Sequence, residues 1–547
     1  MENKEKSITS ENKKNSLVKK GLSLSVLTLF SRILGLIREM TKAKFLGTSS
    51  LSDAFGVAFL IPNLCRRLFA ENSVSVAFIP TFKSYLEDAD TPQGKAKAQD
   101  FVNATFTLVT FLVVIFVALG MIFTPWILRI FYSKEVGDIL NEATVLTRIM
   151  FPYLIVISIA AFFQGILNGI KIFSPSGFTP ILFNAIVILF TYILAPHMAN
   201  PARAMATGVI TGGLVQALFQ LPFVLKNNWK VTFTSLRNAF TNPGTRKVLA
   251  LIGPTIIGMA CYQLNDVVSS TLATRAGEGV YSGLQYSLRL QELILGIFAV
   301  SIGTVILPDL TGFAKREKWQ DFNSLLSKSI KIISLIAIPV SFYSYFMGEN
   351  LIALVFSTGK FNQDSVNLTL VIFRWHIIGL FFIAVNRILA PAFYAQGNTL
   401  LPTIAGIIGF AVNIAVAVIL VNFGYFSKSA MLKGEGIALS LSISSAVNMI
   451  MLFIFFKNTK NTNVSCVIKE SIFYVFKMII FSAIALIPVI LFKDKILALF
   501  AGHNRFISQG LPVVLTALIF AFIGILLLVI TRDSLLDGIF NKLKKRK

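Results

Sequence analysis

Charged residues are scarce in this sequence. Only 14% of its 547 residues are Asp, Glu, Lys or Arg, whereas a soluble domain carries roughly 25%. Hydrophobic residues make up 55%, and the mean hydropathy is +0.74. A water-soluble fold cannot bury so much apolar surface, because its outer face must still be polar. These values exclude a soluble globular protein and predict a polytopic membrane protein.

Histidine and cysteine are also rare. There are three of each, the cysteines lie far apart without a CxxC pair, and each histidine stands alone. Neither a disulfide framework nor a zinc site is therefore indicated. The sequence also lacks a GxxxxGK[ST] phosphate loop and an HExxH motif. We expect a protein that is not an enzyme and has no bound cofactor.

Long uncharged stretches are abundant. A helix needs about 20 mostly apolar residues to cross a hydrocarbon core of roughly 30 Å. The run 388–427 is split by Pro391 and by the turn-like residues 396–398, which predict a helix end, a loop and a new helix. The predicted fold class is all-α, a polytopic membrane protein with 14 transmembrane helices. These helices are placed near 22–44, 51–72, 104–128, 144–168, 178–197, 204–226, 247–271, 282–308, 328–348, 366–390, 400–423, 435–456, 471–493 and 510–531.

Basic residues set the orientation. With the N-terminus in the cytoplasm, the inside segments hold more than twice as many Lys and Arg residues as the outside loops. This bias explains most of the net charge of +24. It predicts that both termini are cytoplasmic. The basic tail at 542–547 follows the last span, where contact with anionic membrane lipid is favoured over nucleic acid.

Several predicted spans carry charge, which is costly at bilayer depth and marks a pathway or site by default. Arginines outnumber acids there, and Arg is suited to bidentate phosphate recognition. For any one Arg–Glu pair, an ion pair that only fixes helix packing is an equally good interpretation. The excess of arginine nevertheless favours a water-accessible cavity for an anion. The charged residues are Arg32, Arg38, Glu39, Asp53, Arg66, Arg67, Glu71, Asp266, Arg289, Glu292, Arg374 and Arg387, with Lys477 as an isolated residue that can snorkel to the surface.

A weak internal repeat divides the chain into two halves. The segment SVAFIP at 75–80 is matched by GTVILP at 303–308, and the residues at 178–181 are matched by those at 401–404 at nearly the same offset. Paired halves with a site between them at mid-membrane are the common plan of transporters. A driving force would then come from an ion gradient or the membrane potential.

Specific sequence blocks run in order along nearly the whole chain. The N-terminal blocks are LFSRILGLIRE at 29–39, SDAF at 52–55, IPNLCRRLFAE at 61–71 and AFIP at 77–80. Further blocks are FPY at 151–153, GILN at 165–168, GP at 253–254, GT at 303–304 with LP at 307–308, GKF at 359–361 and LAPAFY at 389–394. Together these blocks resemble the lipid II flippase (MurJ, MviN) family of the multidrug/oligosaccharidyl-lipid/polysaccharide (MOP) exporter superfamily.

The resemblance implies two six-helix lobes around a central cavity. Its implied parts are a cytoplasmic tail at 1–20, lobes at 21–228 and 245–457, two extra helices at 470–532 that form a lipid-tail groove, and a basic cytoplasmic tail at 533–547. The resemblance also implies that the protein transports undecaprenyl-diphosphate-linked muropeptide from the cytoplasmic to the outer leaflet by alternating access. The localisation would be the bacterial inner membrane. Cell-wall synthesis proteins are possible further partners, and a nucleic acid is not expected.

The family's cavity residues map onto this sequence residue by residue. Its acids fall on Asp53 and Glu292, Glu39 stands where many members have Asp, and Leu288 replaces an acid found in some members. Its arginines fall on Arg32, Arg38, Arg66 and Arg289; with Ser31, Asn63 and Arg67 these complete the predicted substrate-binding set.

We expect Arg32, Arg38 and Arg289 to hold the diphosphate, and Arg66 with Arg67 to capture it from the cytoplasmic side. In this scheme Asp53 and Glu292 pair with arginines in the empty cavity.

An ion site is a further implication of the resemblance. Some members bind sodium in the second lobe, and Asp266 and Asn413 lie on suitable helices. Ala417, one turn after Asn413, offers no ligand, so the coupling ion (sodium or a proton) stays open. Three other functions are considered: a flippase for another polyprenyl-diphosphate glycan, a MATE-type drug/ion antiporter, and a scaffold. The antiporter is disfavoured by the arginine excess, because cationic substrates favour acids.

Overall fold

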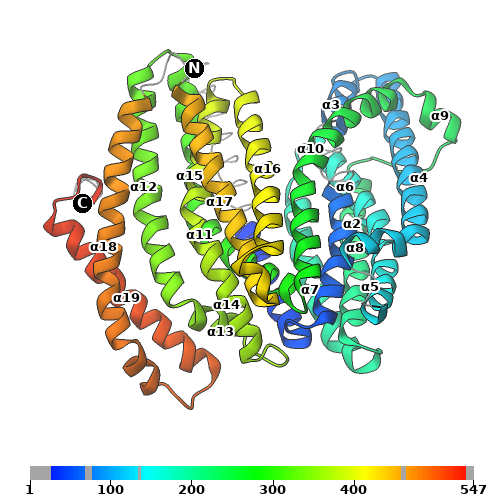
Figure 1. Ribbon diagram of the computed structural model, residues 1–547. Helices are drawn as coiled ribbons and strands as arrows, with labels where there is room; N and C mark the ends of the chain where they lie inside the picture. Colours follow the sequence, from blue (N-terminus) through cyan, green and yellow to red (C-terminus); the bar gives the residue numbers. More distant parts are fainter. Residues whose placement is uncertain (1–25, 68–76, 133–136, 458–463, 537–547) are drawn as a thin grey trace. The chain divides into compact units, whose positions relative to one another are not determined.

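The computed structural model describes residues 26–67, 77–132, 137–457 and 464–536. Every element in these ranges is helical (Figure 1). The predicted tail at 1–20 and most of the tail at 533–547 lie outside the described residues. The chain divides into two compact units, 1–267 and 268–547, and the dividing point falls within one long helix, α10.

The first unit begins with a helix at 26–46 and contains most of α10. Polar caps fix where its helices begin. Thr91 accepts a hydrogen bond from the Gly94 amide before α4, Asn200 accepts one from the Arg203 amide before α8, and each cap is followed by proline. Its helices are α2 (Ser50–Cys65), α3 (Ile79–Glu87), α4 (Pro92–Phe131), α5 (Gly137–Met150), α6 (Tyr153–Gly169), α7 (Ser174–Leu194), α8 (Pro201–Lys226), α9 (Leu236–Thr241) and α10 (Pro243–Ala276).

The second unit contains the remaining helices. The predicted loop at 396–398 is confirmed: α15 ends at Ala395, and α16 begins at Leu400 after a turn in which Gly397 has a φ of +74°. The predicted break at Pro391 is wrong, because this proline lies inside α15. Its helices are α11 (Val280–Lys315), α12 (Trp319–Phe346), α13 (Gly348–Phe356), α14 (Gln363–Ile378), α15 (Leu380–Ala395), α16 (Leu400–Asn422), α17 (Ala430–Lys457), α18 (Val464–Leu499) and α19 (Leu511–Ile530).

Nine helices of the described chain are long and apolar enough to span a membrane, or ten if one bent pair counts as a single span. The other four predicted spans are also helical over much of their length: they correspond to the helix at 26–46, α2, α10 and α11. These four contain most of the charged residues that the sequence places at bilayer depth. The count of fourteen transmembrane helices stays a prediction.

The predicted tenth span at 366–390 is not one straight helix. It consists of α14 and α15, which are bent by 41° at Gly379. A Cβ at Gly379 would lie 3.0 Å from the Cα atom of Ser442 on α17. The close approach of α17 at this glycine accompanies the break, and sequence periodicity alone does not reveal such a neighbour.

Lys477 is not isolated, contrary to our expectation. Its ammonium lies 2.6 Å from Oδ2 of Asp533, beyond the end of the last helix. The Tyr474 hydroxyl and the Leu535 amide donate to the other oxygen of that carboxylate. Asp533 is 3% exposed, so this pair connects the segment just after α19 to α18.

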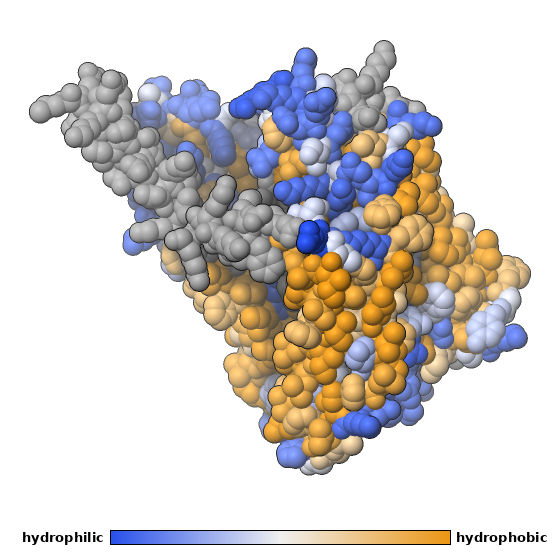
Figure 2. All heavy atoms as spheres, turned by 90° about the vertical axis from the view of Figure 1, so that its left-hand side faces the viewer, coloured by the Kyte–Doolittle hydropathy of each residue, from blue (hydrophilic) through white to orange (hydrophobic). Residues whose placement is uncertain are grey.

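The outer face of the second unit is apolar. α18 and α19 expose large hydrophobic side chains, including Phe473, Leu491, Leu518 and Phe522. Figure 2 shows hydrophobic side chains over the middle of this face, with hydrophilic ones above and below. Such a band is typical of a surface that faces lipid tails.

Candidate functional site

Arg38 is a predicted binding residue whose guanidinium contacts both a carboxylate and aromatic rings. Its guanidinium lies 2.7 Å from Oε1 of Glu39 and is 6.0 Å from the ring of Phe59 on α2 and 5.8 Å from the ring of Phe183 on α7. Cation–π contacts of this kind orient a guanidinium without using its N–H donors. Of the five donors of Arg38, the contacts among the described residues use one. Arg38 is therefore positioned and still able to bind an anion.

Arg32 lies on the same helix, and its side chain is exposed. Within the part of the chain that the structure describes, it has no carboxylate partner. Helix arithmetic places Arg32 and Glu39 on one face, but the carboxylate of Glu39 contacts Arg38 instead. The neighbouring Ser31 is linked to α7, because the Asn184 amide donates to its backbone carbonyl at 3.4 Å.

Lys42 is a charged residue of this region that the sequence analysis did not select. Its side chain is 6% exposed, and Glu39 and Asp53 lie within electrostatic range. Asp53 itself is 4% exposed and lies in the first turn of α2. The spacing of Lys42 three residues after Glu39, which places both on one helix face, is the signal that could have identified it.

The end of α2 brings a second set of predicted residues together. The Nε of Arg66 donates to Oδ1 of Asn63 at 3.0 Å. The Nη1 of Arg67 lies 3.3 Å from Oδ2 of Asp266 and 3.3 Å from Oε1 of Gln263, both on α10. The side chains of Arg67 and Asp266 are 40% and 44% exposed, so this ion pair is open to its surroundings.

In the second unit, Arg289 and Glu292 lie one turn apart on α11. Their side chains lie 3.2 Å apart and are 36% and 60% exposed. Asn413 on α16 is 2% exposed. Its Oδ1 accepts from the Ser440 hydroxyl at 2.9 Å, and its amide donates to Ser269 at 3.4 Å. Among the described residues, no three His, Cys, Asp or Glu side chains form a metal-binding group.

The arrangement is suited to binding an anion. Arginine guanidinium groups carry several donors in a fixed plane, which matches the oxygens of a phosphate. The apolar helices are those of a polytopic membrane protein, and the side chains of Arg67 and Arg289 are exposed by a third or more.

Comparison with known proteins identifies the family. The model of the protein family described as "Lipid II flippase MurJ" matches residues 42–530 of this chain. The probable lipid II flippase MurJ of Treponema pallidum is 45% identical over 523 residues, which cover 95% of this chain and 97% of that protein. The chain therefore belongs to the lipid II flippase MurJ family.

Solved structures agree on the fold. The chain matches an inward closed conformation of lipid II flippase MurJ with a TM-score of 0.75 and 24% identity, over 94% of this chain and 99% of that one. It also matches an inward-facing multidrug resistance MATE family transporter of the MOP superfamily, with a TM-score of 0.61 and 16% identity, over 80% of this chain and 96% of that one. The chain therefore shares the fold of these two proteins.

Proposed function

We propose that this chain is a lipid II flippase. It moves undecaprenyl-diphosphate-linked muropeptide from the inner to the outer leaflet of the bacterial cytoplasmic membrane by alternating access. The observation that carries the proposal is the 45% identity to a probable lipid II flippase over 95% of the chain. In this proposal both termini are cytoplasmic, lobes at 21–228 and 245–457 enclose the cavity, and the helices at 470–532 are an addition to them.

The diphosphate is held by Arg32, Arg38 and Arg289. Arg38 supports this assignment because two aromatic rings fix its guanidinium while most of its donors stay available. Arg32 supports it because its exposed side chain has no carboxylate partner among the described residues. Within the described ranges, Arg289 has one ion-pair contact, at 3.2 Å to the exposed carboxylate of Glu292.

Arg66 and Arg67 capture the headgroup as it enters from the cytoplasmic side. The contact of Arg66 with Asn63 and that of Arg67 with Asp266 hold the two cations side by side at the end of α2. Asp53 and Glu292 neutralise the arginines when the cavity is empty, and the Arg289–Glu292 contact supports that role for Glu292.

The prenyl tail lies along the two extra helices. A cavity of about 500 Å³ between α12, α18 and α19 supports this assignment. It is lined almost entirely by apolar side chains, among them Pro339, Phe481, Ala517 and Phe520. The tail needs no polar contact, so only the headgroup has to be sheltered from the hydrocarbon core.

Transport is driven by a sodium or proton gradient or by the membrane potential. Asp266 and Asn413 are the proposed ion ligands. The contact of Asp266 with Arg67 and that of Asn413 with Ser440 mean that an ion would have to compete with existing partners. An ion near Asn413 would also be coordinated by neutral oxygens.

A depletion-and-rescue experiment tests the proposal. The flippase of a bacterial host is replaced by this chain or by its Arg32→Ala or Arg289→Ala variant, and lipid II in the outer leaflet is measured. We expect the wild-type chain to restore exposure and both variants to fail at normal membrane abundance. Arg129→Ala is the matched control, because Arg129 is an exposed arginine in the last turn of α4.

Each other outcome has a distinct meaning. A correctly inserted wild-type chain that does not restore exposure would favour another lipid-linked glycan or a drug as substrate. Variants that work as well as the wild type would show that the charged helices serve packing. Loss of the variant proteins from the membrane, with the control retained, would point to the same conclusion.

A further inference from the structure

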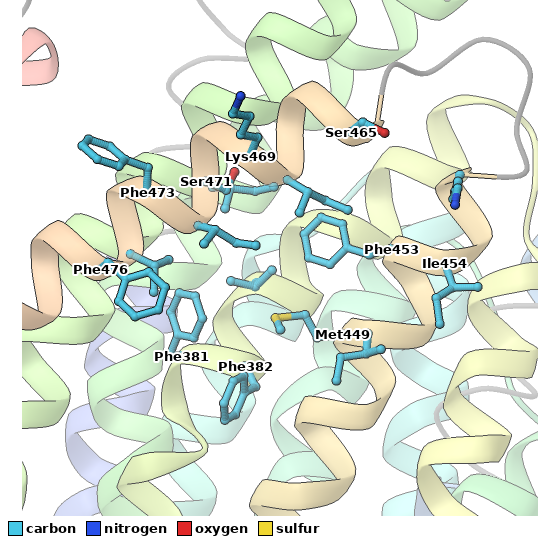
Figure 3. Close-up of a pocket in the computed structure, with 17 residues that line it drawn as sticks. Phe381, Phe382, Met449, Phe453, Ile454, Ser465, Lys469, Ser471, Phe473 and Phe476 are labelled. Carbon is cyan, nitrogen blue, oxygen red and sulfur yellow. The ribbon is translucent and has the colours of Figure 1, made fainter.

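The second unit contains a second apolar groove, separate from the cavity between α12, α18 and α19. It has a volume of about 1040 Å³ and lies between α15, α17 and α18 (Figure 3). A smaller cavity of about 420 Å³ shares Phe381, Phe382 and Val475 with it and extends it along α18 to Ile479. The two form one continuous surface depression.

The groove is polar at one end only. Figure 3 shows Ser465 and Lys469 at one edge, with Phe381, Phe382 and Met449 farther along it. Lys457 also lines the groove and is the last residue of α17. The uncharged run of α17 ends at Lys457, and that of α18 begins after Lys469 and Glu470, so the polar end lies where the apolar membrane section stops.

The two lysines are not neutralised by the described part of the chain. Neither has an ion pair within the described residues. Glu470, the acid next to Lys469, is directed to α12 instead, where its Oε2 accepts from Lys331 at 2.7 Å and from Ser327 at 2.8 Å. Two positive charges therefore remain at the end of an apolar groove.

Ser471 provides an independent sign of a missing ligand. It lines the same end of the groove and is only 5% exposed. Its hydroxyl oxygen has no hydrogen-bond partner in the described structure. A buried hydroxyl without a partner is unfavourable, so this end of the groove favours a ligand whose headgroup forms hydrogen bonds.

The length of the groove distinguishes between lipids. From Ser465 to Ile479 the α18 helix rises about 21 Å, which is about 6 Å more than half of a hydrocarbon core of roughly 30 Å. This length fits the chains and headgroup of a lipid from a single leaflet. An undecaprenyl chain, with its eleven isoprene units, is far longer than a leaflet is deep.

We propose that this groove binds an anionic glycerophospholipid, with its phosphate on Lys457, Lys469 and Ser471 and its acyl chains along Phe382 and Phe453. The ligand belongs to the cytoplasmic leaflet if the orientation inferred from the basic residues holds. The site is distinct from the proposed substrate cavity, and it serves as a lipid-binding site whether or not the chain transports lipid II.

Native mass spectrometry of the full-length protein in detergent tests this proposal. The probes are dioleoyl-phosphatidylglycerol and dioleoyl-phosphatidylcholine. We expect the wild type to prefer phosphatidylglycerol, and the double variant Lys457→Gln/Lys469→Gln to bind it about 10- to 30-fold more weakly. Binding of phosphatidylcholine should not change. The double variant Lys433→Gln/Lys495→Gln is the matched control, because these lysines lie at the opposite ends of the same two helices.

A groove-filling variant locates the acyl chains. Ile472→Trp should weaken the binding of both lipids, because Ile472 lines the groove and is 50% exposed. Met449→Trp is the substitute if the first variant does not fold. The proposal is overturned if the wild type does not prefer phosphatidylglycerol, if the control pair weakens binding as much as the site pair, or if the tryptophan has no effect.

Undecaprenyl phosphate provides the last comparison. If it displaces phosphatidylglycerol from the wild type at equal concentration and its binding shows the same dependence on Lys457, Lys469 and Ile472, the groove belongs to the prenyl chain and the proposal is wrong. If it does not displace phosphatidylglycerol, the glycerophospholipid assignment stands. Lipid II exposure in the rescue experiment is a separate readout, so the two proposals can fail independently.

Discussion

Two ion pairs of this protein have nearly the same geometry and different surroundings. Arg38 and Glu39 in the first unit and Lys477 and Asp533 in the second unit lie 2.7 Å and 2.6 Å apart. The side chains of Arg38 and Lys477 are equally exposed, at 20%. The acids differ, because the side chain of Glu39 is 18% exposed and that of Asp533 is 2% exposed.

The difference lies in how many polar contacts remain available. Both oxygens of Asp533 accept hydrogen bonds, from Lys477 on one side and from Tyr474 and the Leu535 amide on the other. Arg38 has five donors, and one contacts Glu39. A membrane charge whose partner is saturated serves packing, whereas a charge with spare donors is able to bind a ligand.

The largest expected effect follows from removing Arg38. Arg38→Ala should abolish lipid II exposure in the depletion-and-rescue assay. Arg38→Lys should fail as well, because an ammonium cannot offer the planar, bidentate donors of a guanidinium or stack between two rings in the same way. Membrane abundance should stay normal in both variants, as measured by immunoblotting of the membrane fraction.

Rescue by Arg38→Lys would contradict this reading. It would show that a point charge is sufficient at this position and that the rings of Phe59 and Phe183 do not matter for binding. Arg129→Ala again serves as the control, since it removes an arginine from the same unit outside the charged region.

The second largest effect is expected at the saturated pair, and it concerns stability. Removing one partner of a buried ion pair costs about 3–5 kcal/mol. Asp533→Ala should therefore lower the thermal unfolding midpoint of the purified protein strongly. It should leave the transport activity per folded molecule unchanged.

A double variant separates charge from packing. Lys477→Met/Asp533→Asn removes both charges, while the asparagine still accepts hydrogen bonds from the Leu535 amide and Tyr474. We expect it to recover most of the lost stability, because replacing both partners is often close to neutral. A double variant as unstable as Asp533→Ala would mean that the ionic contact itself stabilises the fold.

The sequence predicted the charged helices well and their contacts only in part. The uncharged runs were sufficient to place the helices, and the turn-like residues 396–398 were sufficient to place the turn at Gly397. They could not predict the bend at Gly379, because it coincides with the close approach of Ser442 on α17. The partner of Lys477 lies 56 residues away, beyond the last span, and no local pattern connects the two.

The same limit applies to the candidate site. Family motifs and the cost of charge in a membrane selected Arg38 and Glu39, which are neighbours in the chain. The rings of Phe59 and Phe183 come from two other helices. The sequence has 50 phenylalanines, and composition alone does not show which of them contact Arg38. Lys42 was overlooked because it lies at the end of its span, where a lysine usually faces the membrane surface.

The smallest expected effect concerns the exposed pair of Arg67 and Asp266. An ion pair of this exposure contributes about 0–1 kcal/mol, so Arg67→Gln should not change the unfolding midpoint measurably. As a capture residue, Arg67 should affect the rate of substrate binding, and we expect a decrease of about 3- to 10-fold in initial transport rate that shrinks at high salt. The rate is measured in proteoliposomes that contain the lipid-linked substrate.

Asp266→Asn tests whether the acid restrains Arg67 or binds an ion. If it only restrains Arg67, the variant should transport at least as fast as the wild type, and the double variant should behave like Arg67→Gln. A loss of transport in Asp266→Asn that higher sodium partly restores would instead assign Asp266 to the coupling ion. In that case the Arg67–Asp266 pair differs from the Arg38–Glu39 and Lys477–Asp533 pairs. Asp266 would bind the ion by itself, and Arg67 would compete with the ion for its carboxylate.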